Sequence, residues 1–314
     1  MARFVFVYGR GRNPGWHNYH LHFGFFEKAF LSHGHEVVYY GPKKDGLDAG
    51  PLPYDRRLTT AQVIDKLGGD VYVHMEEPLA REMLSIVPPS IPSVSYVVDL
   101  HRANDPSYVK LADAVVFRGS PYGAQIRKLR RKVGKRKTMF LPFSFDEQVA
   151  SSVPEPKERE RKIAFCGAKR PEHYPLRFKL LPVLKKAKLL SSNSAVSPAL
   201  PYAKYLATYK QAVSALACTG KLGFAHAKHV EICACNTLLF SNGSPFLDAV
   251  LPTDCYVRYN EKNLLSLVRH WVHPNQDGER AEMSKRAFDY VWEHDTDTVR
   301  GRQLMKWFGD LGFV

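Results

Sequence analysis

The segment KHVEICACNTLLF, which runs from Lys228 to Phe240, begins as a short helical pattern and continues directly into an apolar strand. Its helical part carries a single acid, Glu231, among small and apolar residues. A helix that leads straight into a buried strand is typical of proteins in which helices cover a parallel sheet. The segment therefore favours an α/β fold.

The same alternation extends on both sides of this segment and fills the second half of the chain. The expected strands are 162–166, 213–218, 237–240 and 255–258, and the expected helices are 174–188, 261–272, 278–293 and 297–311. Apolar runs that alternate with amphipathic helical patterns indicate a parallel sheet. We therefore expect an α/β domain that ends in a series of helices.

A first series of short apolar runs precedes it. The expected strands are 4–8, 36–40, 70–75, 93–98, 114–117 and 138–142, with helices over 20–32 and 122–133. The stretch from Asp146 to Lys162 is polar and contains prolines, which is typical of an interdomain linker. The expected domains are therefore a Rossmann-like domain over residues 1–150, a linker over 151–161 and a second domain over 162–314.

The composition is that of a soluble globular protein with two domains, because the chain has 314 residues and 45% hydrophobic residues. No run approaches the roughly 18 apolar residues that a membrane span requires. The N-terminal residues enter a strand pattern directly and do not resemble a signal peptide. Five cysteines in apolar surroundings favour reduced core thiols over disulfides. A cytoplasmic location is expected.

The net charge of +14 indicates attraction to a polyanion or to several phosphates. The densest basic segment lies within the expected helix 122–133 and the loop after it. Its cations are Arg127, Lys128, Arg130, Arg131, Lys132, Lys135, Arg136 and Lys137. Such clusters bind nucleic-acid backbones through counterion release. The alternative is a solvated helix end and loop that only increase solubility.

Glu231 lies between Val230 and Ile232, where an isolated carboxylate would be costly to bury without a partner. A ribose diol is a suitable partner, because a carboxylate can accept hydrogen bonds from two neighbouring hydroxyl groups. The alternatives are a salt bridge to Lys228 and an exposed helix face.

Two Rossmann-like domains that face each other form a cleft at the carboxyl ends of their sheets, which suits a diphosphate. After the first expected strand, Gly11 and Gly15 allow a close backbone approach to a ligand. Their spacing is not the dinucleotide fingerprint, so a nicotinamide or flavin cofactor is not expected. A loop without ligand contact is the alternative.

The loop after the strand 162–166 is basic. Lys169, Arg170 and Arg177 could stabilise the negative charge that gathers on a departing nucleoside diphosphate. The alternative is that they are ordinary surface cations.

Asp99 and His101 follow the expected strand 93–98, at the end where α/β sites collect their chemistry. His101 could act as a base or hydrogen-bond a transferred group, and Asp99 could orient it or take the proton of an acceptor. A structural pair that caps the next helix is the alternative. The histidines at 17, 20 and 22 lack matching Asp or Cys residues, so no metal is expected.

On the basis of these residues, the chain resembles the GT-B glycosyltransferases. Its second half is similar to the spore-maturation group of this class. That group is related to a large retaining family that uses nucleotide-sugar donors. The residues that carry this resemblance are 165–167, Arg177, 228–235, 237–240, 255–260, 263–265, 294–296 and Arg300. A looser likeness in the first half comes from 34–37, 99–101, 112–117 and 141–146.

The resemblance implies a GT-B fold and a metal-independent transferase. Its second domain would bind the donor, with Lys228, His229 and Glu231 at the site, and its first domain would bind the acceptor. The broader family usually has a second Glu eight residues before the ribose Glu, but Gly223 stands there. The contact to the transferred sugar would then come from Phe224, His226 or a backbone N–H. Glu231 is therefore expected to anchor the donor ribose and not to be a catalyst.

The leading hypothesis is a hexosyl- or pentosyltransferase that moves a sugar from a UDP-sugar to a hydroxyl acceptor. The charge favours a polyanionic acceptor such as the hydroxymethylated bases of bacteriophage DNA, in the host cytoplasm, with the base flipped out of the stack. One alternative is a transferase that acts on a polysaccharide, a protein or a small molecule. Another is a non-catalytic nucleic-acid-binding protein with a transferase fold.

Overall fold

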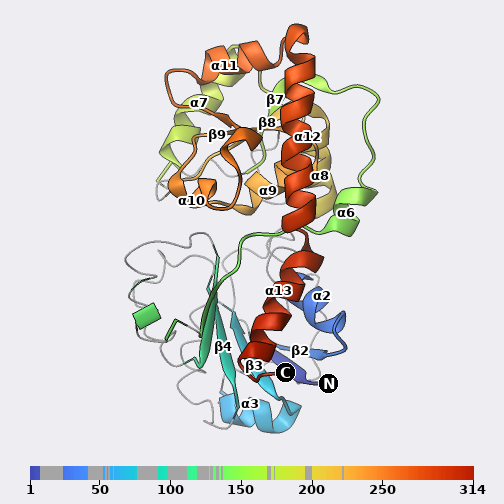
Figure 1. Ribbon diagram of the computed structural model, residues 1–314, viewed down its shortest axis with the longest axis vertical. Coiled ribbons are helices and arrows are strands. Elements are labelled where there is room, and N and C mark those ends of the chain that lie inside the picture. Colours follow the sequence, from blue (N-terminus) through green and yellow to red (C-terminus); the bar gives the residue numbers. More distant parts are fainter. Residues whose placement is uncertain are drawn as a thin grey trace. The chain divides into compact units, whose positions relative to one another are not determined.

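The computed structural model describes residues 1–7, 24–41, 52–53, 55, 57–58, 60–75, 91–97, 112–118, 127, 130–131, 134–135, 137–167, 171–172, 174–194, 200–220 and 223–314. The chain forms two compact units, each with a parallel sheet of its own (Figure 1). The units divide the chain between Pro142 and Phe143, and the last residues, 300–314, belong to the first unit. The domain boundaries at 150 and 162 stay a prediction.

The first unit is built on a six-stranded sheet with the order β2-β1-β3-β4-β5-β6, in which every pair of neighbours is parallel. Its strands are β1 (Arg3–Val7), β2 (Glu36–Tyr40), β3 (Val71–Met75), β4 (Ser93–Val97), β5 (Ala114–Phe117) and β6 (Thr138–Phe140). All six predicted strands are confirmed. They form because each is a run of β-branched and aromatic residues that a buried parallel sheet accommodates on both faces.

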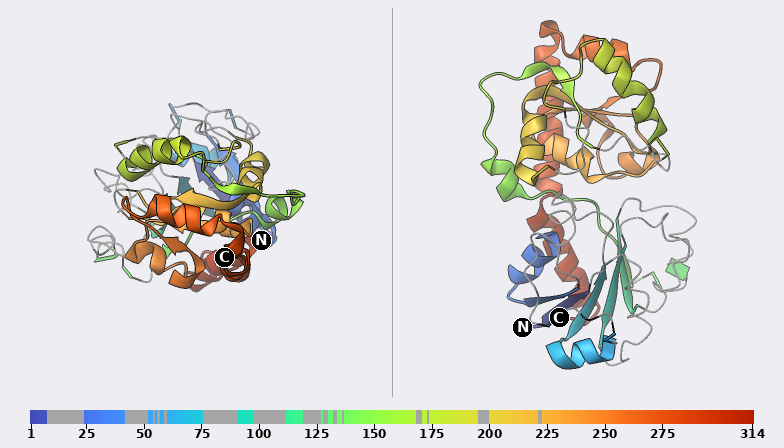
Figure 2. Two further views of the ribbon diagram at one scale, coloured as in Figure 1. Left: turned by 90° about the horizontal axis from the view of Figure 1, so that it is seen from above. Right: turned by 180° about the vertical axis from the view of Figure 1, so that it is seen from behind.

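Within the described residues, three helices accompany this sheet: α2 (Phe25–Leu31), α3 (Thr60–Leu67) and α13 (Asp297–Asp310). In α2, Phe26 and Phe30 lie one turn apart, so both rings reach the same buried face. The Phe30 ring stacks on Phe308 of α13 with 5.7 Å between centroids and on Phe4 of β1 with 3.9 Å. The two chain ends lie near each other in this unit (Figure 2). Of the predicted helix 122–133, only three residues are described.

The second unit contains a four-stranded parallel sheet with the order β10-β9-β8-β7. Its strands are β7 (Glu160–Ala164), β8 (Ala212–Ala217), β9 (Leu238–Ser241) and β10 (Val257–Arg258). Its helices are α6 (Glu147–Ser152), α7 (Pro175–Lys186), α8 (Tyr202–Lys210), α9 (Ala227–Ala234), α10 (Pro245–Asp248), α11 (Leu264–Trp271) and α12 (Asp277–His294), with short 3-10 turns at Thr253–Cys255 and Pro274–Gln276. The predicted strands and helices of this half are confirmed, and α6, α8 and α10 are additional.

Helices cover both faces of this sheet (Figure 1). Helices α8, α9 and α12 pack on the face that Ala215 and Ala217 of β8 present. Helices α7 and α11 pack on the opposite face, which carries Leu216. This alternation follows from the two-residue period of a strand. None of the described helices combines the length and the apolar composition needed to cross a membrane.

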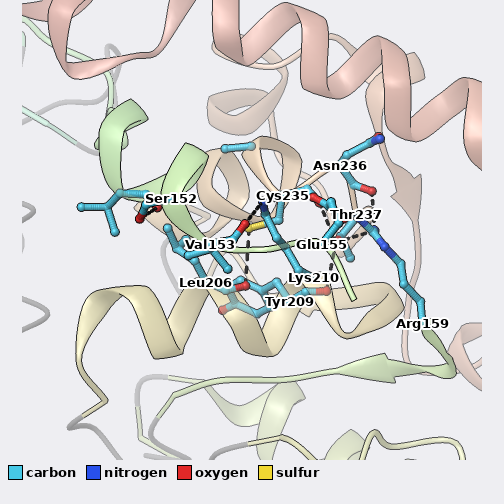
Figure 3. Close-up of polar contacts among 12 residues, drawn as sticks. Ser152, Val153, Glu155, Arg159, Leu206, Tyr209, Lys210, Cys235, Asn236 and Thr237 are labelled. Carbon is cyan, nitrogen blue, oxygen red and sulfur yellow. Dashed lines mark hydrogen bonds and ion pairs between the residues drawn. The ribbon is translucent and has the colours of Figure 1, made fainter. Parts of the chain in front are cut away.

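The predicted linker is partly ordered in the second unit. Residues 147–152 form α6, whose N-cap Asp146 accepts hydrogen bonds from two backbone N–H groups. The buried Lys210 donates to the Val153 carbonyl oxygen at 2.7 Å, and Arg159 donates to the carbonyl oxygens of Cys235 and Asn236 at the end of α9 (Figure 3). The segment is therefore fixed, because two basic side chains satisfy carbonyl groups that would otherwise need water.

Candidate functional site

Two glycines mark the carboxyl ends of neighbouring strands in the second unit. Gly167 follows β7 with a φ of +135°, and Gly220 follows β8 with a φ of +69°. A side chain is strained at such angles, so glycine is required for these turns. The carboxyl ends of parallel strands lie at one edge of the sheet, which is where α/β proteins bind ligands.

Two cations lie beside Gly167. Arg177 of α7 is 2% exposed, and its guanidinium group lies over the Tyr174 ring at 3.7 Å from the centroid. Lys228 of α9 donates from Nζ to the Cys166 carbonyl oxygen at 2.5 Å. A Cβ atom at position 167 would collide with Lys228 Nζ and would lie 3.7 Å from Arg177 Nη1. The glycine thus makes room for both cations.

The two cations repel each other. Burial lowers the pKa of Lys228 to about 8, and the nearby charge of Arg177 contributes to this lowering. Within the described residues no acid forms an ion pair with Lys228. An anion bound between the two cations would remove this repulsion and favour the charged form of Lys228. The arrangement is therefore suited to an anionic ligand.

The two histidines at the start of α9 are neutral near pH 7. Burial lowers the pKa of His226 well below its ordinary value and that of His229 to about 4. His229 is 1% exposed, its Nδ1 accepts from the His226 backbone N–H at 3.0 Å, and its Nε2 lies 3.2 Å from Ser241 Oγ. Both ring nitrogens of His229 are thus engaged within the protein. His226 Nε2 is buried, and the His226 ring interacts with the Thr219 backbone.

Glu231 lies three residues after Lys228 on α9, a spacing that places both side chains on the same side of a helix. It has no exposed surface. Its Oε2 accepts a hydrogen bond from the Tyr205 hydroxyl group of α8 at 2.8 Å, and Tyr202 of the same helix also hydrogen-bonds the carboxylate. Burial raises the pKa of Glu231 to about 7, although the hydrogen bonds from Tyr205 and Tyr202 and the charge of Lys228 oppose this rise.

The partners of Glu231 in the protein are therefore two tyrosines of another helix, Tyr205 and Tyr202. The ion pair with Lys228 that the sequence left open does not form, although Lys228 acts on the Glu231 pKa through its charge. The alternative of an exposed helix face is excluded, since Glu231 is buried.

Gly223 stands where the broader family has its second Glu, and the structure explains why a larger residue is unsuited there. Its φ is +72°, and a Cβ atom would lie 3.3 Å from the Cβ atom of Ser244. Ser244 Oγ donates to the Gly223 carbonyl oxygen at 2.5 Å. Asn236, after α9, has a φ of +49°, a left-handed conformation that asparagine tolerates.

Several predicted site residues lie outside the described residues. These are Gly11, Gly15, Asp99, His101, Lys169 and Arg170, together with Lys128, Lys132 and Arg136 of the basic cluster. Their roles stay predictions.

The rest of the basic cluster lies between β5 and β6. Arg127, Arg131, Lys135 and Lys137 are exposed, and no described acid forms an ion pair with any of them. Arg130 is half-buried and lies over the Phe117 ring at 5.7 Å from the centroid. The exposed members have their charges in water, as a surface that attracts a polyanion requires.

Sequence reasoning missed Tyr174, which supports Arg177, and Tyr205, which holds Glu231. A signal for Tyr205 existed, because Tyr202, Tyr205 and Tyr209 recur at the spacing of one helix face. No comparable pattern marked Tyr174. All five cysteines, each among the described residues, are buried and free of disulfides, as predicted. The part of the chain that the structure describes holds no cluster of three or more His, Cys, Asp or Glu side chains suited to a metal ion.

No protein-family model and no curated protein matches this sequence. Solved structures do match. An alpha-glucosyltransferase in complex with UDP-glucose and DNA containing an abasic site matches with a TM-score of 0.68 and 13% identity, over 97% of this chain and 98% of that chain. Sucrose-phosphate synthase from Thermosynechococcus elongatus matches with a TM-score of 0.63 and 14% identity, over 99% of each chain.

S. aureus MnaA in complex with UDP matches with a TM-score of 0.60 and 12% identity, over 100% of this chain and 98% of that chain. At such identities the likeness shows the fold. Together with the two parallel-sheet units and the helical C-terminus, it shows that the chain has the GT-B fold. The narrower likeness to the spore-maturation group stays a prediction.

Proposed function

We propose that the protein is a glycosyltransferase that transfers a sugar from a UDP-sugar to a hydroxyl acceptor, with a hydroxymethylated base of DNA as the preferred acceptor. The observation that carries the donor half of this proposal is the pair of cations, Lys228 and Arg177, beside the Gly167 turn. Glu231 lies about one turn further along the same helix as Lys228. In a nucleoside diphosphate, the diphosphate and the ribose are also only a short distance apart, comparable to the distance from Lys228 to Glu231 along the helix.

In this proposal Lys228 and Arg177 bind the diphosphate, and the N-terminal N–H groups of α9 add to the positive potential. When the acceptor oxygen bonds to the anomeric carbon, the bond from that carbon to the diphosphate oxygen breaks, and negative charge gathers on the departing diphosphate. Fixed cations stabilise this charge more strongly than the charge of the bound donor. Lys169, Arg170, Gly11 and Gly15 are proposed to complete the phosphate site.

The acceptor hydroxyl group must also lose its proton. Asp99 and His101 remain the proposed residues for this step, as base and as the group that orients the base or the sugar. No resident metal or cofactor is part of the proposal.

Glu231 is proposed to bind the donor ribose. The carboxylate accepts from Tyr205 and Tyr202, and it has further acceptor positions for a ribose hydroxyl group. Because the side chain has no exposed surface, a ribose reaches the carboxylate only when a group that covers it moves on binding.

Two observations support DNA as the acceptor. The net charge is +14, and Arg127, Arg131, Lys135 and Lys137 are exposed. The similar alpha-glucosyltransferase structures include complexes with UDP-glucose and DNA and with UDP and a 13-mer DNA containing a HMU base. A phosphate-binding surface would hold the duplex while the target base leaves the stack.

The test has two arms. A thermal-shift screen with UDP and a set of UDP-sugars examines the donor, because a ligand of the folded state raises its stability. Sugar incorporation into a hydroxymethylated duplex, with the same duplex lacking the hydroxymethyl group as control, examines the acceptor. Stabilisation by a UDP-sugar without incorporation into DNA would direct the search to polysaccharide, protein or small-molecule acceptors. Tight DNA binding without any UDP-sugar binding would instead support a non-catalytic nucleic-acid-binding protein.

A further inference from the structure

Two phenylalanines form an aromatic pair at the carboxyl edge of the sheet in the second unit. Phe224 follows β8 on the segment that leads into α9, and Phe246 lies in α10, which follows β9. Their ring centroids are 5.6 Å apart, the ring planes are inclined by 53°, and both residues are partly exposed. Aromatic side chains that reach the surface at this edge are candidates for ligand contact, because α/β proteins bind ligands there and line their sites with such residues.

The two loops that carry the aromatic pair are fixed to each other. The Asn242 side chain accepts from the Thr219 backbone N–H and donates to the Thr219 hydroxyl oxygen, each at 2.9 Å. Ser244 Oγ donates to the Gly223 carbonyl oxygen at 2.5 Å and accepts from the Leu247 backbone N–H at 3.0 Å. These bonds lie directly beside the two rings in the sequence, so they set the position of the pair. A ligand that contacts a fixed surface loses little affinity to the ordering of side chains.

The structure also shows why an apolar group stands where the broader family has an acid. A Cβ atom at Gly223 would lie 3.3 Å from Ser244 Cβ and 3.6 Å from Phe246 Cδ2. A side chain at position 223 would therefore point toward α10, and a carboxylate against the Phe246 ring would be costly. Phe224 is the next residue along the chain.

The aromatic pair and the two cations of the candidate site lie along the same edge of the sheet. Lys228 and Arg177 lie beside Gly167 after β7, and β7, β8 and β9 are consecutive neighbours in the sheet. Neighbouring strands are about 4.8 Å apart, so the loops after β7 and β9 are separated by roughly 10 Å. This separation is comparable with the length of a sugar joined to a diphosphate. A sugar on a diphosphate bound by the cations can therefore reach the aromatic pair.

We propose that Phe224 and Phe246 form the binding surface for the apolar C–H face of the sugar that the donor carries. The inference rests on the proposed function, since it takes a UDP-sugar as the ligand. The hydroxyl groups of a pyranose lie mainly around the rim of its ring, and its faces carry C–H bonds. An aromatic ring removes such a face from water while the hydroxyl groups at the rim keep their hydrogen bonds. The pair contacts the sugar and takes no part in proton transfer.

The experiment is calorimetric binding of UDP and of UDP-glucose to the full-length wild-type protein and to Phe224→Leu. Leucine keeps an apolar side chain and removes the flat ring. We expect the affinity for UDP-glucose to fall about fivefold and the affinity for UDP to stay within about twofold, because only UDP-glucose carries the sugar. Phe246→Leu should give the same pattern. Equal weakening of both ligands, or no change in either, would overturn the proposal.

Two control variants separate the ring from a general effect on folding. Phe178→Leu changes a phenylalanine of α7 that is 49% exposed in the same unit, and it should keep both affinities. Phe224→Tyr retains the ring and should also keep both.

The remaining outcomes concern the acceptor and the donor itself. If Phe224→Leu weakens binding of the hydroxymethylated duplex and leaves the UDP-glucose affinity unchanged, the rings contact the acceptor and the proposal is wrong. It is also wrong if UDP binds the wild-type protein and UDP-glucose does not. If UDP itself does not bind, the proposed function fails first, and the two failures are thereby distinguished.

Discussion

The chain presents positive charge in two different ways. Lys228 and Arg177 are held in place, one by a carbonyl oxygen and the other by an aromatic ring, and burial lowers the pKa of Lys228 to about 8. Arg127, Arg131, Lys135 and Lys137 extend into water, and no described acid pairs with them. Fixed and partly desolvated cations favour one compact anion at a defined position. Solvated cations attract any polyanion, and salt screens them over about 8 Å at physiological ionic strength.

The largest effect that would sharpen this contrast is expected from Lys228→Ala. Removal of one of two fixed cations should weaken UDP binding several hundredfold, about 3–4 kcal/mol, because truncation of a buried charged contact costs roughly 2–5 kcal/mol. Isothermal titration calorimetry provides the measurement. Lys179→Ala is the control, since Lys179 is an exposed cation that pairs with Glu261 at 3.2 Å. If the UDP affinity of Lys228→Ala falls by less than about threefold, the fixed cation contributes no more to UDP binding than a solvated one does.

The next effect is on the free energy of unfolding and comes from the buried Glu231. Burial raises the pKa of Glu231 from 4.5 to about 7, so the folded protein holds this proton more tightly than the unfolded chain does. The free energy of unfolding therefore falls as the pH rises through this window, by up to about 3 kcal/mol for this group. Glu231→Gln should be more stable than wild type by up to that amount at pH 8 and nearly equal to it at pH 4. Urea unfolding at both pH values measures this, and a difference of the same size at both would contradict it.

A smaller effect is expected when the four exposed cations are replaced together by glutamine. DNA affinity should fall about tenfold at physiological salt, and the slope of log K against log salt should decrease by up to about 3.6, because each phosphate that a cation neutralises adds about 0.9 to it. UDP affinity should not change. The DNA measurement is fluorescence anisotropy over a salt series. An unchanged salt slope would mean that these side chains do not bind the DNA backbone.

The smallest effect is the pH dependence of UDP binding. Below about pH 7 Glu231 takes up a proton, and above about pH 8 Lys228 releases one. Affinity should therefore be highest between these values and should fall about fivefold within one pH unit on either side. His229, with its pKa lowered to about 4, does not contribute to this window. The measurement is calorimetric titration with UDP at several pH values from 6 to 9. If neither group contacts the ligand, the UDP affinity will not change over this range.

The strands and the cation pair were accessible to sequence reasoning for different reasons. Apolar β-branched runs such as residues 114–117 have few alternatives to a buried strand, so their positions were predicted closely. Arg177 and Lys228 were identified because they follow or precede such strands. Helix α8 was not predicted, because the lysines and small residues between its tyrosines obscured their spacing along one helix face.

Long-range contacts account for what sequence reasoning did not find. Tyr205, one partner of Glu231, is 26 residues away on another helix, and local patterns contain no information about such a pair. The support of Arg177 by the Tyr174 ring also depends on side-chain direction and not on spacing. The linker is a further case. Lys210 donates to the Val153 carbonyl oxygen of the linker, and Arg159 of the linker donates to the Asn236 carbonyl oxygen after α9.

That fixed linker has a consequence for protein engineering. Arg159 caps the end of α9, and Lys210 donates to the Val153 carbonyl oxygen, so the segment 153–159 folds with the second unit. A chimera that contains the second unit should therefore also contain this segment. Chimeras that exchange the first unit for that of another protein should be joined near Pro142 and near Val299, where the chain passes between the units. A junction inside residues 153–159 would instead remove the cap from the helix that carries Lys228 and Glu231.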